Sequence, residues 1–281
     1  MSGSPAGIAS GPAVPAVIRD ALVQAGRAQR DGGPAAAVAV LSAAMEQVRT
    51  TPFGVAFMAR VQLALALTDA CLAAGDRERA RRLLLDESGY TEQIVQLLRL
   101  NGTPEQQRTA SAGRMQVRDR AVQVERLGQP APELDIADWV LGELASLTDL
   151  KGQVILLEFW ATWCRPCLEM FPRLRELHAR YRADGLEILA LTRHAPPPAG
   201  TDSTLSRQQQ LDLVRTVIAG RGLDIRVGIA PDGRLQQQYG ANGVPTLVLI
   251  DRQGRVREIG SGGDDPALDA AIEACLAEPR P

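Results

Sequence analysis

Two cysteines separated by two residues, Cys164 and Cys167, lie in the stretch FWATWCRPCLEMFP. This spacing fits a disulfide that opens and closes during catalysis, half of a metal site, or chance. A structural zinc site takes four ligands. The remaining cysteines and histidines are isolated from one another: Cys71, Cys275, His178 and His194. We therefore expect a redox dithiol, with no metal and no cofactor.

The surroundings of Cys164 favour a reactive thiol. The apolar run 152–160 is typical of a buried strand, and a helix is expected from the cysteines to about Ala183. A cysteine where a strand ends and a helix begins gains from the exposed N–H groups and the positive end of the helix dipole, which stabilise a thiolate. Cys167, one turn later, is placed to attack a mixed disulfide formed at Cys164 and release the substrate.

Arg165 lies between the two sulfurs in sequence. A guanidinium beside a thiolate lowers the pKa of the thiol, and stabilising the reduced form makes the disulfide more oxidising. We therefore expect Arg165 to raise the reduction potential modestly. The alternative is a solvated side chain that affects substrate choice alone.

The motif WCRPC resembles the active site of the thioredoxin superfamily, with Trp163 directly before the first cysteine and Pro166 directly before the second. Pro172 matches the proline that kinks the active-site helix in that superfamily. More specifically, the sequence from APELDIADWV through LTDLKGQVILLEFWATWCRPC resembles the TlpA/ResA-like disulfide reductases. The likeness covers about residues 128–276 and does not extend to the N-terminal helices.

The resemblance implies further site residues. The superfamily has a cis proline at the position of Pro245 in GVPT, where it exposes the backbone of Val244 for pairing with a substrate strand. An ordinary proline at a strand start is the alternative. The family also places an acidic residue at the position of Glu158, beneath the second cysteine, to relay a proton. If the strand were less buried, Glu158 would be an edge polar residue. The expected substrate-binding residues are Trp163, Arg165, Pro166, Val244 and Pro245.

Residues 128–281 are expected to form an α/β thioredoxin-like domain, a mixed sheet flanked by helices. Apolar runs and turn residues predict strands at 152–160, 186–192, 225–230, 246–250 and 255–260. Helices are predicted after the cysteines, around 205–219, briefly within 231–240, and from Pro266 onward.

Residues 1–127 are expected to form an all-α domain of helical hairpins with a flexible N-terminal tail. Helical periodicity runs from about 15 to 125, and turn residues divide it into five or six helices. The predicted turns lie at 28–34, 49–54, 73–78, 87–90 and 100–105. Residues 30–41 also match 73–84, which resembles a degenerate tetratricopeptide-type repeat. An ordinary helical domain is the alternative; a true repeat would offer a concave protein-binding face.

The composition limits the classes of partner and location. The net charge of −2 argues against nucleic acid, which needs a clustered positive surface. The sequence shows neither a signal-peptide pattern nor the roughly 20 apolar residues of a transmembrane segment. We expect a cytoplasmic protein; an extracytoplasmic or periplasmic location is the alternative if a leader is missing from this chain.

We therefore predict a thiol-disulfide oxidoreductase that reduces protein disulfides and exchanges electrons with an upstream thiol-disulfide donor or acceptor, while the N-terminal helices dock a partner protein. One alternative is an interaction or scaffold protein with a thioredoxin fold. Another is a peroxiredoxin-like peroxide reductase, which needs Thr and Pro upstream of its cysteine; Thr162 is near, but the proline is missing.

Overall fold

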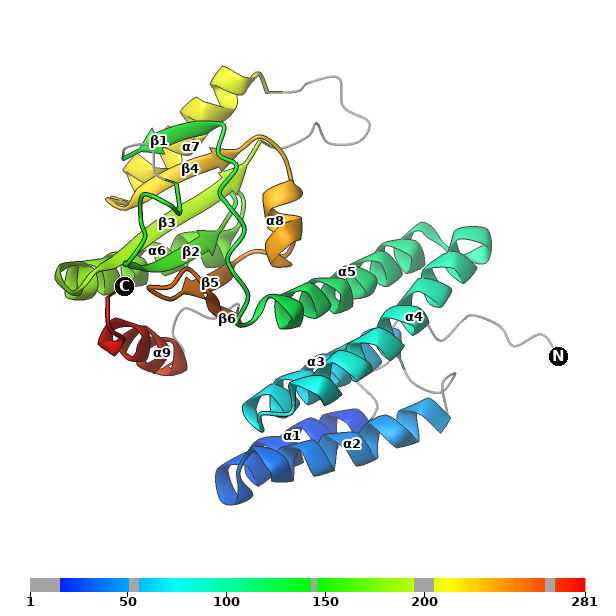
Figure 1. The fold of residues 1–281 in the computed structure, drawn as a ribbon. Helices are drawn as coiled ribbons and strands as arrows, with labels where there is room; N and C mark the ends of the chain where they lie inside the picture. The colour runs from blue at the N-terminus through cyan, green and yellow to red at the C-terminus, as the bar shows by residue number, and fades with distance from the viewer. Residues whose placement is uncertain (1–15, 51–55, 143–145, 195–204, 261–265, 281) are drawn as a thin grey trace. The chain divides into compact units, whose positions relative to one another are not determined.

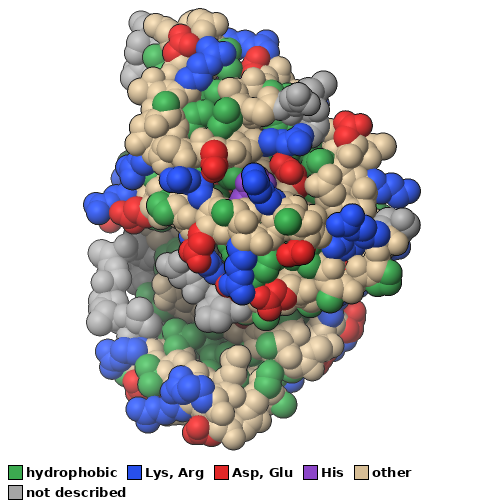
Figure 2. Space-filling view, turned by 90° about the vertical axis from the view of Figure 1, so that its left-hand side faces the viewer, with side chains coloured by type: hydrophobic (Ala, Val, Ile, Leu, Met, Phe, Trp, Pro, Cys, Tyr) green, Lys and Arg blue, Asp and Glu red, His purple; other side chains and the backbone are tan. Residues whose placement is uncertain are grey.

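Two compact units make up the chain, Met1–Glu125 and Arg126–Pro281. The computed structural model describes residues 16–50, 56–142, 146–194, 205–260 and 266–280 (Figure 1). The predicted N-terminal tail lies outside these residues. Among the described helices, none combines the length and the apolar composition needed to cross a membrane. On the face drawn in Figure 2, basic and acidic side chains are interspersed.

The first unit is helical, as predicted. Its elements are α1 (Ala16–Gly32), α2 (Pro34–Thr50), α3 (Phe57–Ala73), α4 (Arg77–Asn101) and α5 (Pro104–Arg126). Helix α3 is buried on most of its surface, which is typical of a helix that others surround. Ala37 and Leu41 on α2 are buried, and so are Ala80 and Leu84 at the matching positions of α4. The tetratricopeptide assignment itself stays a prediction.

The predicted turn at 87–90 is wrong, because α4 continues through it without a break. Glu87 is buried, and its two carboxylate oxygens accept hydrogen bonds from Arg60 Nε at 2.7 Å and Arg60 Nη2 at 3.0 Å. The Arg60 guanidinium also lies 3.5 Å from the ring centroid of Tyr90. A glycine in a helix costs about 1 kcal/mol relative to alanine. These tertiary contacts on either side of Gly89 outweigh that cost.

Neutralising Glu87 will strongly destabilise the helical unit. Glu87→Gln leaves the buried Arg60 guanidinium without a counter-ion, and breaking a buried pair in this way costs about 3–5 kcal/mol. The measurement is urea unfolding of the full chain followed by far-ultraviolet circular dichroism. As a control, Glu125→Gln removes a pair with Arg81 whose side chains are 53% and 48% exposed, and we expect a loss below about 1 kcal/mol. Equal losses in the two variants would contradict the prediction.

The second unit contains a six-stranded sheet in the order β1-β4-β3-β2-β5-β6. Strands β2, β3 and β4 are parallel, whereas β1, β5 and β6 pair antiparallel to their neighbours. The strands are β1 (Asp138–Leu141), β2 (Val154–Phe159), β3 (Leu186–Arg193), β4 (Arg226–Ala230), β5 (Thr246–Ile250) and β6 (Val256–Gly260). The helices are α6 (Arg165–Tyr181), α7 (Arg207–Gly220), α8 (Arg234–Tyr239) and α9 (Pro266–Ala277). This mixed sheet with flanking helices confirms the predicted thioredoxin-like fold class.

Strand β2 lies in the middle of the sheet and is buried along its whole length. Successive side chains of a strand point to opposite faces. Val154, Leu156 and Trp160 pack into one core cluster with residues of α6, α7 and α9, including both site cysteines. Ile155, Leu157 and Phe159 pack into a second cluster with residues of α8. By this alternation, Glu158 faces the cluster that contains the cysteines.

Candidate active site

Cys164 and Cys167 are joined by a disulfide at the start of α6, with an S–S distance of 2.08 Å and a Cα–Cα distance of 5.4 Å. Cys164 caps the helix, and its sulfur accepts a hydrogen bond from the backbone N–H of Cys167 at 3.3 Å. Both residues are buried. The Cys164 sulfur therefore sits where the helix N–H groups and dipole stabilise a negative charge.

Glu158 is completely buried in β2, six residues before Cys164. Neither of its carboxylate oxygens has a hydrogen-bond partner among the described residues. Burial raises the pKa of Glu158 well above its ordinary value of 4.5, because a carboxylate loses its hydration there. The alternative of an edge polar residue is wrong, since β2 is central and has a neighbour on each side. The carboxyl group, on the cysteine face of the sheet, therefore keeps its proton to a higher pH than an exposed glutamate does.

The Val244–Pro245 peptide bond is cis, the form that the resemblance implies. Phe159 at the end of β2 pairs with Thr246 at the start of antiparallel β5. Val244 and Pro245 therefore lie just beyond the end of β2, on the side where the chain continues toward the cysteines. Val244 packs against the core cluster that contains both sulfurs. The register of the sheet thus brings a segment some eighty residues away to the CxxC motif.

The residues around the disulfide differ in exposure. Trp163, Arg165 and Pro166 are exposed, so they form a rim beside the buried sulfurs. Arg165 Nε donates a hydrogen bond to Glu169 Oε1 at 2.7 Å. Glu169 is a neighbour of the site that is not among the predicted site residues, although a spacing of four residues on a helix is a known signal for an ion pair.

A cluster of polar side chains, His194, Asp138 and Arg207, lies at the carboxyl end of β3. His194 Nε2 is 2.8 Å from Asp138 Oδ2, and Arg207 donates two hydrogen bonds to the same carboxylate. The Arg207 hydrogen bonds are the main cause that holds the pKa of Asp138 below its ordinary value. The cluster ties β1 and α7 to the end of β3. Sequence analysis left His194 out of the site, and the structure joins it to β1 and α7 rather than to a sulfur.

Comparison with known proteins identifies the family. Residues 127–259 match the AhpC/TSA family. The thiol-disulfide oxidoreductase ResA of Bacillus anthracis is 32% identical over 133 residues, which are 47% of this chain and 68% of that protein. The chain belongs to the ResA-like thiol-disulfide oxidoreductases. The resemblance drawn from WCRPC and its surroundings is therefore confirmed.

A second ResA-like relative supports the same assignment. ResA of Geobacillus thermodenitrificans (strain NG80-2) is 31% identical over 136 residues, covering 48% of this chain and 70% of that protein. Among solved structures, a thioredoxin-family thiol:disulfide interchange protein from Chlorobium tepidum TLS is 23% identical with a TM-score of 0.43, covering 53% of this chain and 96% of that one. The AhpC/TSA match lies within the α/β unit, Arg126–Pro281.

Proposed function

We propose that this chain is a thiol-disulfide oxidoreductase that reduces protein disulfides through Cys164 and Cys167. The supporting observation is the disulfide itself, formed between a helix-capping sulfur and a buried sulfur one turn later. An upstream thiol-disulfide donor returns the pair to the dithiol.

In the proposed reaction, the Cys164 thiolate attacks one sulfur of the substrate disulfide and expels the other as a thiolate. The product is a mixed disulfide between Cys164 and the substrate. Cys167 then gives up its proton and attacks the Cys164 sulfur, which releases the second substrate thiolate and closes the internal disulfide. The ionised form of Glu158 is the proposed acceptor of the Cys167 proton, because its carboxyl group is buried on the same face of the sheet as Cys167 and its raised pKa makes the carboxylate a stronger base than an exposed glutamate.

Substrate binding is proposed at the rim of the site. The cis bond before Pro245 leaves the backbone of Val244 available to pair with an extended substrate segment. Trp163 and Pro166, which flank Cys164 and Cys167 in sequence, offer exposed apolar surface. In a cytoplasmic location, where thiols are kept reduced, the reaction runs toward reduction, whereas an extracytoplasmic location permits either direction.

The test of this function is the reduction of insulin disulfides by the purified chain with dithiothreitol as electron donor. We expect turnover by the wild type, and we expect Cys167→Ser to capture disulfide-linked proteins in the native host. A chain that neither reduces insulin nor forms Cys164-dependent adducts would refute the proposal. Peroxide consumption without insulin reduction would favour the peroxide reductase instead.

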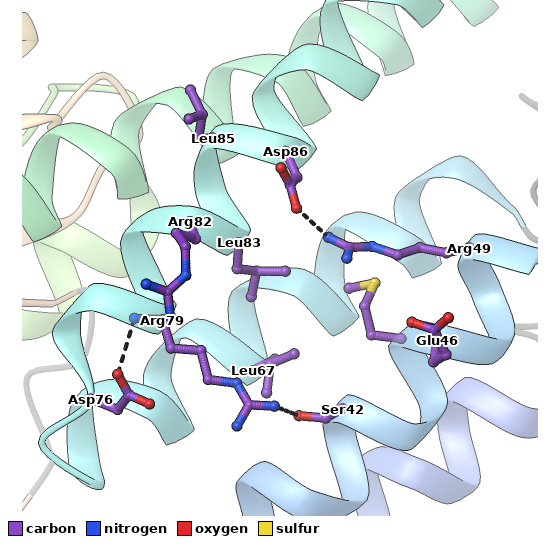
Figure 3. A pocket seen from close by; sticks show the side chains of 11 residues that line it. Ser42, Glu46, Arg49, Leu67, Asp76, Arg79, Arg82, Leu83, Leu85 and Asp86 are labelled. Carbon is purple, nitrogen blue, oxygen red and sulfur yellow. Dashed lines mark hydrogen bonds and ion pairs between the residues drawn. The ribbon is translucent and has the colours of Figure 1, made fainter.

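We also propose that the helical unit docks the partner protein through the groove between α2 and α4, which has a floor on α3 and a volume of about 690 Å³ (Figure 3). The buried lining of the groove is apolar, with Met45 from α2, Leu67 from α3 and Leu83 from α4. The full lining is Ser42, Met45, Glu46, Arg49, Leu67, Asp76, Arg79, Arg82, Leu83, Leu85 and Asp86. A groove with an apolar floor and charged walls suits an amphipathic segment of a protein.

On the α4 side of the groove, Arg79 favours an acidic group of the partner. Arg49 is already paired with Asp86 at 3.0 Å. The Arg79 guanidinium donates to the neutral Ser42 hydroxyl at 2.6 Å and has no carboxylate partner among the described residues. An acidic side chain of the partner would form an ion pair with Arg79, and neighbouring apolar side chains of the partner would cover the apolar lining of the groove.

Reversing the charge of Arg79 will impair partner capture and spare the chemistry. In the Cys167→Ser background, Arg79→Glu should lower the yield of native adducts several-fold, because the groove then repels an acidic segment. Reduction of insulin by Arg79→Glu in the wild-type background should be unchanged. The control is Arg108→Glu, an exposed arginine of α5 that does not line the groove. Equal adduct yields from both variants would refute the docking role.

A further inference from the structure

The residue between the two sulfurs is held by an ion pair. Arg165 is the first residue of α6, and its Nε lies 2.7 Å from Oε1 of Glu169, one helical turn further on. Their side chains are 87% and 56% exposed. The free guanidinium that the sequence predicts beside the Cys164 thiolate is therefore bonded to a carboxylate.

Glu169 opposes a thiolate at Cys164 in two ways. Its negative charge offsets the positive charge of Arg165, and it also adds a carboxylate close to the site, two residues past Cys167. The first turn of α6 contains no acidic residue, so Glu169 is the first carboxylate along the helix after the sulfurs. Because a nearby negative charge disfavours an anion, Glu169 makes the thiolate less stable than Arg165 alone would.

We propose that Glu169 is a positioning residue that holds Arg165 and keeps the Cys164–Cys167 pair more reducing than an unpaired arginine would. This inference rests on the proposed oxidoreductase function. Reduction of the disulfide consumes two electrons and two protons and forms two thiols, of which the helix terminus favours ionisation at Cys164. A group that stabilises this thiolate favours the reduced form and raises the reduction potential of the Cys164–Cys167 pair. A group that neutralises the stabilising charge lowers this reduction potential.

The test measures the equilibrium of the pair with glutathione buffers and the pKa of the Cys164 thiol by its thiolate absorbance. We expect Glu169→Gln to shift the equilibrium toward the dithiol roughly threefold, about 14 mV at 29.6 mV per tenfold, and to lower the thiol pKa. Arg165→Gln should shift both quantities the opposite way. The double variant should return close to the wild type, and 1 M salt should shrink each shift because both groups are exposed.

The matched control is Glu176→Gln, on the same helix, where Glu176 pairs with Arg173 at 3.1 Å. It should leave the equilibrium and the thiol pKa unchanged. Shifts in the same direction for Arg165→Gln and Glu169→Gln, or no shift in either, would overturn the proposal, since a purely structural pair changes only the melting temperature. A wild type with no reversible exchange with glutathione would instead overturn the oxidoreductase function, so the two failures are distinguishable.

Discussion

Replacing Cys164 by serine will reduce disulfide reduction to the uncatalysed rate, whereas replacing Cys167 by serine will stop the reaction after its first step. The two variants differ in effect because the two cysteines occupy different positions on α6. Cys164 caps α6 and carries the sulfur that the helix terminus stabilises as a thiolate, while Cys167 is buried one turn inside. A serine hydroxyl at position 164 cannot form the mixed disulfide. A serine at 167 leaves that intermediate without the thiol that resolves it, so it accumulates.

The measurement is insulin reduction together with non-reducing electrophoresis of the adducts. Cys71→Ala and Cys275→Ala serve as controls, because these two thiols are buried and unpaired. Burial raises the pKa of Cys71, and it raises that of Cys275 to about 11, so neither supplies a thiolate at neutral pH. Stable adducts from Cys164→Ser, or loss of activity in both controls, would contradict the assignment of Cys164 as nucleophile.

The sequence predicts the α/β unit well where strands are fully buried, because long apolar runs bounded by turns have few other interpretations. Strand β1 is different: its four residues are half-buried at the sheet edge, and among the residues that the structure describes they pair with β4 alone. Nothing in a short segment of that kind distinguishes it from a loop. The continuous α4 was missed for a related reason, since the contacts of Glu87 with Arg60 join two helices and are not visible in local composition.

The candidate site likewise contains some features that the sequence predicts and others that it does not. The CxxC motif and Glu158 are local in sequence, and the cis Pro245 was expected from the resemblance. The helical spacing of four residues is typical of an ion pair between Arg165 and Glu169, whereas the predicted effect of Arg165 follows from its place between the two sulfurs alone. The contact between His194 and Asp138 joins residues 56 positions apart through β1, so an analysis that lacks that strand has no basis for expecting it.

Glu158→Gln will make the folded protein more stable at neutral pH while it slows catalysis. The pKa of Glu158 is raised by burial, so between 4.5 and the folded-state value the native protein holds a proton that the unfolded chain has lost. The free energy of unfolding then falls as pH rises, by about 1.4 kcal/mol per pH unit across that window. Below pH 4.5 both states are protonated and the effect disappears. Glutamine has the shape of the protonated acid and never ionises.

The stability difference between Glu158→Gln and the wild type should therefore be small at pH 4 and should grow in favour of the variant above pH 4.5. Urea unfolding of the oxidised proteins measures it, because the disulfide then keeps the two sulfurs from titrating. A difference that does not change with pH would show that Glu158 ionises in the native state as it does in the unfolded chain.

Catalysis should change in the opposite direction. At pH values where Glu158 of the wild type is ionised, loss of this carboxylate should slow release of the mixed disulfide by about a hundredfold, the lower end of what a positioned base contributes. Single-turnover reduction of a model disulfide, followed over pH, measures this step. Glu187→Gln is the control: Glu187 lies on neighbouring β3 and pairs with Arg226 at 2.8 Å, so its loss should leave the rate unchanged. A Glu158→Gln variant that resolves the mixed disulfide at the wild-type rate would exclude Glu158 as the proton acceptor.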